Sequence, residues 1–568
     1  GGIWEFTHPQ VQPIDMEEQH EAAKLLPVYP LTEGLNQGQM RRVATAVLET
    51  CLDALDDVFP DAYRAGHELW PIRKAIRAIH APADRRELES ARRRLIYQEL
   101  LVLQLALALK HNEQHSRRNA PPFEATAKID ARIRRLFPFE MTAAQNRAID
   151  EVAADMARPH PMNRLLQGDV GSGKTVVAVY SMLLAVAHGH QAVLMTPTEV
   201  LARQHAATLE RTLAASHVKW GVLTGGTSPA EREELLRQLA AGELNVVIGT
   251  QAILQPDVCF ARLGLVVIDE QHKFGVRQRA SLKQAALDPH YLVMTATPIP
   301  RTVAMTIFGD LDVSTLDELP PGRQTVHTYL VGQDQQAKWW DFFGRKLREG
   351  HQGYIVTPLI DESSEADVAS LEQVYESLAH GPLEAYRLGL LHGRMTSSAK
   401  EETMQAFRRG DTQALVTTTV IEVGIDVANA TLMAIYGGER FGLSQLHQLR
   451  GRISRGTQPG YCAVFSDVQS ADARKRLEAF VATNDGFELA EIDFKLRGPG
   501  DLLGTRQHGL PPLRIADLAR DAAVLDEARR DAQHLVASDP TLAAPDYALL
   551  RQMVLCRYGR VLELGDVG

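Results

Sequence analysis

The stretch LLQGDVGSGKT, residues 165–175, contains the spacing GxxxxGK followed by Thr. Apolar residues lead into this stretch and predict a strand, and residues 176–187 have the composition of a helix. A strand, a glycine-rich turn and a helix N-terminus together form a phosphate-binding loop, because glycines let backbone N–H groups curl around phosphate oxygens. The sequence therefore predicts a nucleotide site at this turn.

The side chains of this loop have distinct expected roles. Lys174 is expected to reach the β and γ phosphates of a bound nucleotide, and the Thr175 hydroxyl is expected to ligate Mg²⁺. The predicted nucleotide contacts in the loop are Gly168, Gly171, Ser172, Gly173, Lys174 and Thr175.

Two adjacent carboxylates follow a second apolar run. In VVIDEQH, residues 266–272, the apolar residues place Asp269 and Glu270 at the C-terminal end of a strand, where open α/β sheets bind their ligands. Asp269 is expected to hold Mg²⁺, and Glu270 to orient or deprotonate an attacking water. Beside a phosphate-binding loop, this pair indicates nucleotide hydrolysis.

Short apolar runs without polar alternation recur between helical stretches. They lie at 192–196, 245–250, 265–270 and 291–297, and again at 354–360, 387–393, 414–420, 431–438 and 461–467. Strands of this kind, spaced by helices, predict parallel sheets covered on both faces. The linker signal PPG at 320–322 separates the two sets, so we expect two consecutive α/β lobes.

Helical spacing dominates outside these lobes. We expect four parts: a helical region at 1–136 that begins with a strand at about residues 3–8, a first lobe at 137–322, a second lobe at 323–480 and a helical tail at 481–568. The dense leucines between residues 95 and 107 predict a helix that is largely buried.

Composition excludes several classes of protein. The 568 residues are 45% hydrophobic and 23% charged, which is typical of a globular protein and not of a disordered chain. The four cysteines lie far apart, which argues against a zinc site or a disulfide framework. The longest apolar run, residues 100–109, is too short to span a membrane. The net charge is −10, yet residues 71–135 carry 15 Lys and Arg against 7 Asp and Glu, so this segment either contacts DNA phosphates or forms a solvated helical face.

The ordered motifs resemble those of superfamily 2 helicases. DEQH at 269–272 is similar to the DExH box, and FEMTAAQ at 139–145 to the adenine-reading Q motif. Further matches follow in family order: TPTEVLA at 196–202 (motif Ia), GTQ at 249–251, TATP at 295–298 (motif III), TTVIEVGID at 418–426 (motif V) and QLRGRISR at 448–455 (motif VI).

Finer features resemble the bacterial RecG family. They are GDVGSGKT at 168–175, DEQHKFGV at 269–276, TATPIPRT at 295–302, ERFGLSQLHQLRGR at 439–452 and DFKLRGPGDLLGTRQHG at 493–509, the last similar to the TRG motif that this family shares with the coupling factor Mfd. Ser454 stands where the family usually has glycine. The chain starts at Gly1, and we expect most of the family's N-terminal wedge domain to be missing.

The resemblance implies two RecA-like motor lobes with ATP and Mg²⁺ between them, a helical linker before them and a TRG hook after them. It implies adenine contact by Phe139 and Gln145, further nucleotide contacts at Gly424 and Asp426, and arginine fingers at Arg452 and Arg455. The residues that it assigns to DNA contact or coupling are Thr196, Pro197, Thr198, Gly225, Gly249, Thr250, Gln251, Thr295, Thr297, Thr418, Arg497, Arg506 and Gln507.

The implied activity is ATP-driven translocation on double-stranded DNA. The expected substrates are branched DNA molecules, stalled forks and Holliday junctions, in recombination and repair. The expected setting is a monomer in the bacterial cytoplasm, associated with the nucleoid and with single-stranded DNA-binding protein as a partner, and not with a membrane. Two alternatives stay open: an Mfd-like translocase that couples transcription to repair, and a catalytically weak DNA-binding scaffold.

Overall fold

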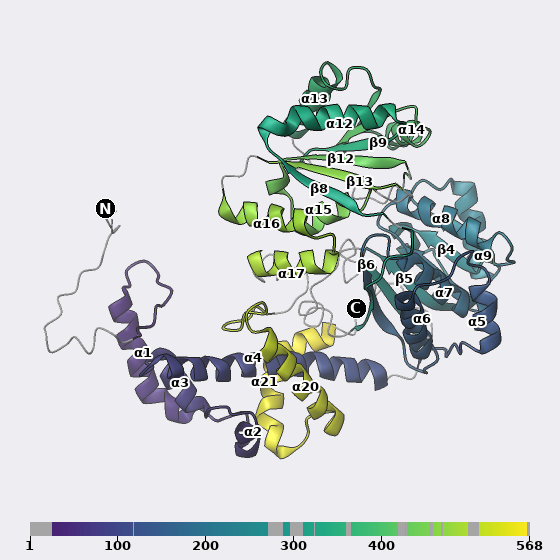
Figure 1. Cartoon of the computed structure of the whole chain (residues 1–568). Coiled ribbons are helices and arrows are strands. Elements are labelled where there is room, and N and C mark those ends of the chain that lie inside the picture. Colours follow the sequence, from purple (N-terminus) through teal and green to yellow (C-terminus); the bar gives the residue numbers. More distant parts are fainter. Residues whose placement is uncertain are drawn as a thin grey trace, which may run out of the picture. The chain divides into compact units, whose positions relative to one another are not determined.

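The computed structural model describes residues 25–116, 119–270, 288–295, 311–322, 324–358, 365–418, 427, 429–453, 458–466, 470–497 and 511–564. The chain divides into two compact units (Figure 1): one combines Gly1–Leu109 with Gly509–Glu563, and the other holds Lys110–His508 and the last residues, Leu564–Gly568. Among the helices of these described residues, none combines the length and apolar character that a membrane crossing requires. The strand expected at residues 3–8 lies outside the described residues.

The first unit is helical and is built from both ends of the chain. Its helices are α1 (Gln37–Cys51), α2 (Asp61–Gly66), α3 (Ile72–His80), α4 (Arg85–Ser116, of which the part to Leu109 belongs here), α20 (Ala522–Ser538) and α21 (Ala548–Leu564). Tyr97, Leu100, Leu101 and Leu105 of α4 have no exposed surface. The prediction of a largely buried helix over these leucines is therefore confirmed.

The second unit begins with a seven-stranded parallel sheet. Its strands are β1 (Asn163–Gly168), β2 (Gln191–Met195), β3 (Trp220–Leu223), β4 (Val246–Gly249), β5 (Leu263–Asp269), β6 (His290–Thr295) and β7 (Asp312–Leu316), in the order β3-β4-β2-β5-β6-β1-β7. The helices that accompany it are α5 (Ala127–Arg134), α6 (Ala143–Met156), α7 (Lys174–Ala187), α8 (Glu199–Leu213) and α9 (Pro229–Ala240).

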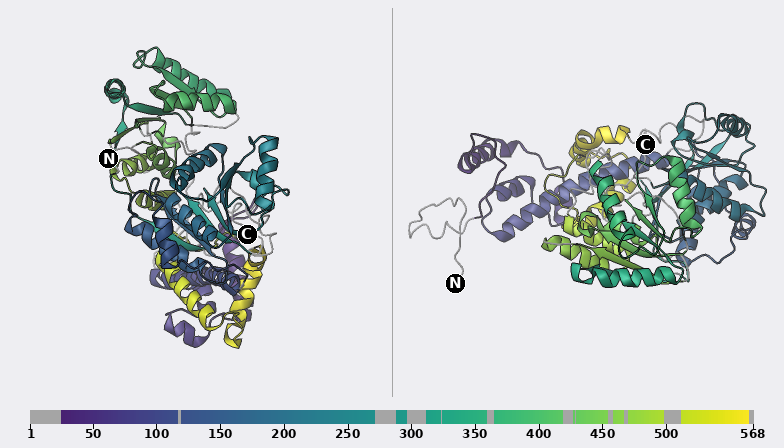
Figure 2. Two further views of the ribbon diagram at one scale, coloured as in Figure 1. Left: turned by 90° about the vertical axis from the view of Figure 1, so that its right-hand side faces the viewer. Right: turned by 90° about the horizontal axis from the view of Figure 1, so that it is seen from above.

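A six-stranded parallel sheet follows. Its strands are β8 (Val326–Val331), β9 (Gln352–Val356), β10 (Leu388–Leu391), β11 (Ala414–Thr417), β12 (Ala430–Tyr436) and β13 (Gly460–Phe465), in the order β10-β11-β9-β12-β13-β8. Helices α12 (Gln336–Arg348), α13 (Glu365–Ala379) and α14 (Ser397–Arg408) cover one face, and α15 (Leu443–Arg450) and α16 (Ala471–Ala482) cover the other (Figures 1 and 2). Helix α17 (Gly486–Arg497) follows α16 and packs against it and against α15.

Continuous apolar strands are buried here because successive side chains enter different cores. In β2, Ala192 and Leu194 join one hydrophobic cluster of the first lobe, while Val193 and Met195 join another. Alternation of this kind places apolar side chains on both faces of a sheet, so no polar face remains. The expected fold class, two consecutive parallel-sheet lobes flanked by helical regions, is confirmed.

Candidate functional site

The phosphate-binding loop (the P-loop, residues 168–175) connects β1 to α7. Gly171 has φ +79° and Gly173 has φ +87°, a region that residues with a side chain rarely adopt. A Cβ atom at Gly173 would also collide with the side-chain amide of Gln145. The backbone conformation of the loop therefore requires glycine at both positions. Because Gly173 is the N-cap of α7 and has no side chain to cap it, the N-terminus of this helix stays open and partially positive.

Lys174 lies against its own loop. Its Nζ donates hydrogen bonds to the carbonyl oxygens of Gly168, at 2.7 Å, and of Asp169, at 2.8 Å. These contacts hold a positive charge at the loop, where phosphate oxygens can exchange for the carbonyls.

The Q-motif glutamine ties α6 to the P-loop. Gln145 is 2% exposed, and its Oε1 accepts a hydrogen bond from the backbone N–H of Thr142, which completes a capping box at the start of α6. Its Nε2 donates to the carbonyl of Ser172 at 3.0 Å. Phe139 is 52% exposed and leaves an aromatic face open near the start of the same helix.

The chain that leaves the first lobe is fixed to α6 as well. After β7, Glu318 accepts a hydrogen bond from the backbone N–H of Ala144 at 3.1 Å, and Asp317 pairs with Arg147 at 2.7 Å. The N-terminal turns of α6 are therefore bonded both to the P-loop and to the segment that leads to the second lobe.

The acidic pair lies at the end of β5, at the same edge of the sheet as the P-loop. Glu270 has φ +56°, an uncommon backbone conformation for a residue with a side chain, and its N–H donates to the carbonyl of Met294 at 3.1 Å. Asp269 is held by a residue that the sequence analysis did not identify: Nε2 of His205, on α8, lies 2.8 Å from its Oδ2. The sequence did contain a sign of this role, because His205 lies on the apolar face of α8 that Ala202, Ala206 and Leu209 form.

The residues expected to contact DNA differ in how far they are exposed. Thr196, Thr295 and Thr418 are at most 3% exposed, so their hydroxyls are directed into the protein. Gly225 and Gln251 are exposed, and Pro197, Thr198 and Thr250 are partly exposed, whereas Gly249 is buried. At the buried positions, DNA can be contacted only by the backbone of neighbouring residues and not by the buried side chains.

Motif VI packs directly against the P-loop. A Cβ atom at Gly451 would lie 2.8 Å from the side chain of Val170, although the φ of −65° at Gly451 suits any residue. The next residue, Arg452, is 8% exposed. The close approach of motif VI to the P-loop therefore explains why residue 451 is glycine. The same approach places Arg452 beside the P-loop.

Several expected site residues lie outside the described residues. They are Thr297, Gly424, Asp426, Arg455, Arg506 and Gln507, together with Ser454. Arg497 is the last residue of α17, and only its backbone is described.

A buried carboxylate holds the segment that follows the TRG motif. Glu99 of α4 accepts hydrogen bonds from the backbone N–H groups of residues 514–516 at 2.8–3.0 Å, and it binds the Arg557 side chain at 2.5 Å. Burial alone would raise the pKa of Glu99, but the three amides and Arg557 outweigh it and hold the pKa below its ordinary value.

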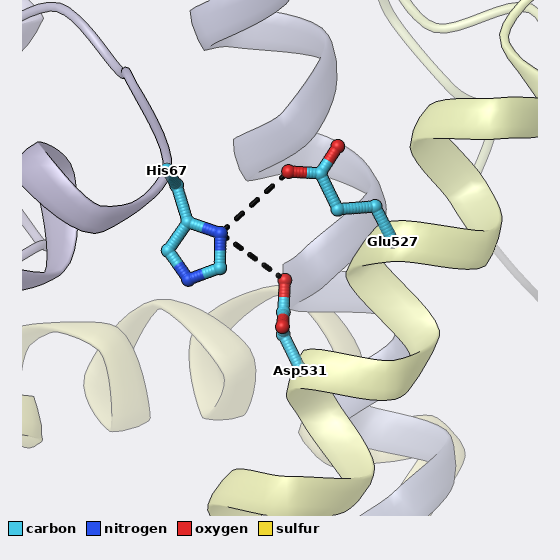
Figure 3. A group of neighbouring side chains, drawn as sticks. All are labelled: His67, Glu527 and Asp531. Carbon is cyan, nitrogen blue, oxygen red and sulfur yellow. Dashed lines mark ion pairs between the residues drawn. The ribbon is translucent and has the colours of Figure 1, made fainter.

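A histidine and two carboxylates also meet in the helical unit (Figure 3). His67 Nδ1 lies 3.6 Å from Glu527 and 3.5 Å from Asp531. Both carboxylates are already bound: Arg93 donates to Glu527 and the Tyr97 hydroxyl to Asp531. The group is therefore an ion-pair cluster, and it uses part of the basic stretch at 71–135. Arg94, in the same stretch, is fully buried against Asp57.

Comparison with known proteins agrees with these motifs. The family model for DEAD/DEAH box helicases matches residues 142–306, that for the helicase conserved C-terminal domain matches 338–457, and that for the C-terminal part of domain 3 of ATP-dependent DNA helicase RecG matches 483–557. The chain is 44% identical over 562 residues to ATP-dependent DNA helicase RecG of Synechocystis, covering 98% of this chain and 67% of that protein. It is 43% identical to the Bacillus subtilis RecG, covering 98% and 82%, and 42% identical to the Escherichia coli K12 RecG, covering 94% and 78%.

The fold comparison gives the same result. A structure of RecG bound to a three-way DNA junction superposes with a TM-score of 0.71 and 41% identity, covering 90% of this chain and 67% of that one.

Proposed function

Since the chain belongs to the RecG family of ATP-dependent DNA helicases, we propose that it translocates on double-stranded DNA and remodels branched DNA, regressing stalled forks and migrating Holliday junctions in recombination and repair. The observation that carries the proposal is the contact between motif VI and the P-loop at Gly451 and Val170, in a chain whose relative was solved on a three-way DNA junction. The identities favour this function over an Mfd-like coupling factor.

The proposal assigns a part of the motor to each stretch of the chain. Residues 137–322 and 323–480 are the two motor lobes, residues 1–136 contain a strand of the wedge domain and the helical linker, and residues 481–568 contain the TRG hook. A monomeric state, binding to single-stranded DNA-binding protein and a place at the nucleoid remain predictions from the family resemblance.

Residues of the first lobe would bind ATP. The open N-terminus of α7 and Lys174 would take the phosphates, with Phe139 and Gln145 beside the base. Thr175 and Asp269 provide the hydroxyl and carboxylate oxygens that Mg²⁺ prefers, so the residues fit this ion. Bound Mg²⁺ would neutralise charge that develops on the phosphates. Glu270 would orient the attacking water and accept its proton.

Residues of the second lobe would complete the site. Arg452 and Arg455 would stabilise the charge of the phosphoryl transition state, and Gly424 and Asp426 would contact the nucleotide. Because these groups belong to a different lobe from the P-loop, ATP binding would close the lobes and hydrolysis would release them.

DNA contact would come from loops at the ends of the strands. The exposed and partly exposed residues at 198, 225 and 250–251 can offer backbone N–H groups and polar side chains to phosphates, which position DNA without reading its sequence. Arg497, Arg506 and Gln507 would couple the lobe cycle to the duplex.

Steady-state ATP hydrolysis tests the proposal. The full chain is assayed without DNA, with linear duplex, with single strands and with a model fork, at a stated salt concentration. We expect stimulation by duplex and fork that Lys174→Ala abolishes. A folded chain that binds DNA but hydrolyses no ATP on any of these substrates would instead be a scaffold.

A further inference from the structure

A buried histidine connects the helix that follows motif Ia to the acidic end of β5. His205 is 8% exposed and lies 2.8 Å from Asp269 Oδ2, although 64 positions separate the two residues. A polar side chain among apolar neighbours is costly to bury unless it is paired. Here Asp269 is the partner, so the orientation of its carboxylate depends on the position of α8.

The segment that leads into α8, residues 196–199, includes one candidate DNA loop and is hydrogen-bonded to two others. The backbone N–H of Thr196 donates to the carbonyl of Gly249 at 2.8 Å, and the Thr196 hydroxyl donates to the carbonyl of Thr198 at 3.0 Å. The carboxylate of Glu199 accepts a hydrogen bond from the backbone N–H of Gly226 at 2.8 Å. The loops at 196–198, 225–226 and 249–251 are therefore joined to one another and to the first turn of α8.

Helix α8 is a short rigid connection between these loops and His205. Glu199 and His205 are six residues apart, which in an α-helix is a rise of about 9 Å. Displacement of the loops moves the helix as a body, because its backbone hydrogen bonds resist bending. The hydrogen bond from His205 then moves the Asp269 carboxylate with it.

We propose that His205 is a positioning residue that transmits DNA contact at these loops to Asp269. This rests on the proposed function, in which the loops bind DNA and Asp269 binds Mg²⁺. His205 itself touches neither DNA nor nucleotide. Its role is to make the placement of the metal-binding carboxylate, and hence the rate of hydrolysis, depend on whether the loops are in contact with DNA.

A set of variants separates this role from a merely structural one. His205→Gln keeps an N–H donor at about the reach of Nε2, whereas His205→Leu removes the donor at similar volume. Glu210→Gln, on the exposed face of α8, is the matched control. Each full-length variant is assayed for hydrolysis without DNA and with saturating forked duplex, for affinity to a fluorescent duplex and for thermal unfolding.

We expect the ratio of DNA-stimulated to basal hydrolysis to fall at least tenfold in H205L, while its affinity for duplex stays within twofold. H205Q should retain most of the stimulation, and E210Q all of it. If H205L is unstable, His205→Asn gives the same readout, because its shorter amide ends at the position of Nδ1, away from Asp269.

Two results would overturn the inference. One is full stimulation in H205L or H205N. The other is an equal fall of basal rate, stimulated rate and unfolding temperature in all His205 variants, H205Q included, which would mark a structural residue. Absence of DNA stimulation in the unmodified chain is a different result: it would overturn the proposed function, and this inference with it.

Discussion

His447 of α15 binds Asp169 of the P-loop: its Nε2 lies 2.5 Å from Asp169 Oδ1, although 278 positions separate the two residues. On its other side, His447 Nδ1 accepts a hydrogen bond from the Arg450 guanidinium at 2.9 Å. Because arginine can only donate, Nε2 carries the ring proton and donates to Asp169. Arg450 in turn donates to the carbonyl of Phe480 and stacks on its ring. One chain of contacts thus connects the P-loop to α16.

Removing the imidazole should uncouple motif VI from the P-loop. We expect His447→Ala to lower the DNA-stimulated kcat by about tenfold, because small misplacements of catalytic groups are costly, while nucleotide affinity changes little. Stopped-flow binding of a fluorescent nucleotide and steady-state hydrolysis measure the two quantities. His380→Ala, on an exposed surface of the same lobe, is the control. An equal loss in both variants would contradict the prediction.

Adding a methyl group at Gly451 should separate the same two segments. The new Cβ would lie 2.8 Å from the Val170 side chain, so Gly451→Ala should reduce kcat by about tenfold or more. Val170→Gly removes the Val170 Cβ and Cγ atoms that would lie 2.8–3.1 Å from the new methyl group, and we expect the double variant to recover much of the loss. A double-mutant cycle on kcat measures this coupling, and strictly additive effects would show that the contact does not limit turnover.

Loss of the charge on Glu99 should destabilise the helical unit. Glu99→Gln leaves Arg557 and some of the amides at 514–516 without their carboxylate, which should cost about 2–3 kcal/mol in unfolding free energy. Urea unfolding of the full chain, followed by far-UV circular dichroism, measures it. Glu89→Gln, an exposed position on the same helix, should be nearly neutral.

The same carboxylate should contribute to acid sensitivity. The folded-state pKa of Glu99 lies below its ordinary value, so its contribution is present above the unfolded-state pKa and is lost as pH falls through the folded-state pKa. The stability lost between pH 6 and pH 3 should therefore be smaller in Glu99→Gln than in the unmodified chain. An identical loss in both proteins would show that Glu99 is not a source of the pH dependence.

The four thiols should differ in reactivity. Cys51, Cys259 and Cys556 are exposed, whereas burial of Cys462 in β13 raises its pKa to about 12. Because the thiolate is the reactive form, we expect three thiols to react with a maleimide in the native chain and the fourth only after unfolding. Mass spectrometry of the labelled chain counts them, and fast labelling of Cys462 would contradict the buried position.

Central strands could be predicted from the sequence, whereas three of the four edge strands could not; the fourth, β10, lies in the predicted run at 387–393. The runs that became β2, β4, β5, β6, β9, β12 and β13 are continuously apolar because neighbours cover them on every side. The strands β3, β7 and β8 were not predicted, and all three lie at a sheet edge. Their residues alternate between buried and partly exposed, as in Val326–Val331, so they lack the apolar run that marks a strand in the centre of a parallel sheet.

The motifs identified which residues share the nucleotide site but not how they are held. Spacing alone placed Lys174 and Asp269 beyond the C-terminal ends of two strands, β1 and β5, which β6 separates in the sheet. The partners of Asp269 and Asp169 come from helices 64 and 278 positions away, and nothing local in the sequence specifies such pairs. Of the two partners, His205 could more easily have been identified from the sequence than His447, because a histidine on an apolar helix face requires a polar partner.

The bond between Glu99 and the amide of Arg514 has a consequence for biosynthesis. These residues are 415 positions apart, and at about 5–20 residues per second a ribosome needs roughly 20–80 s to make the chain between them. During that interval α4 is already outside the exit tunnel with an unpaired carboxylate and its leucine surface uncovered. The parallel-sheet lobes can fold as they emerge, whereas the helical unit has to wait for the last helices. Nascent chains should therefore depend on a chaperone most strongly between the completion of α4 and the arrival of α20.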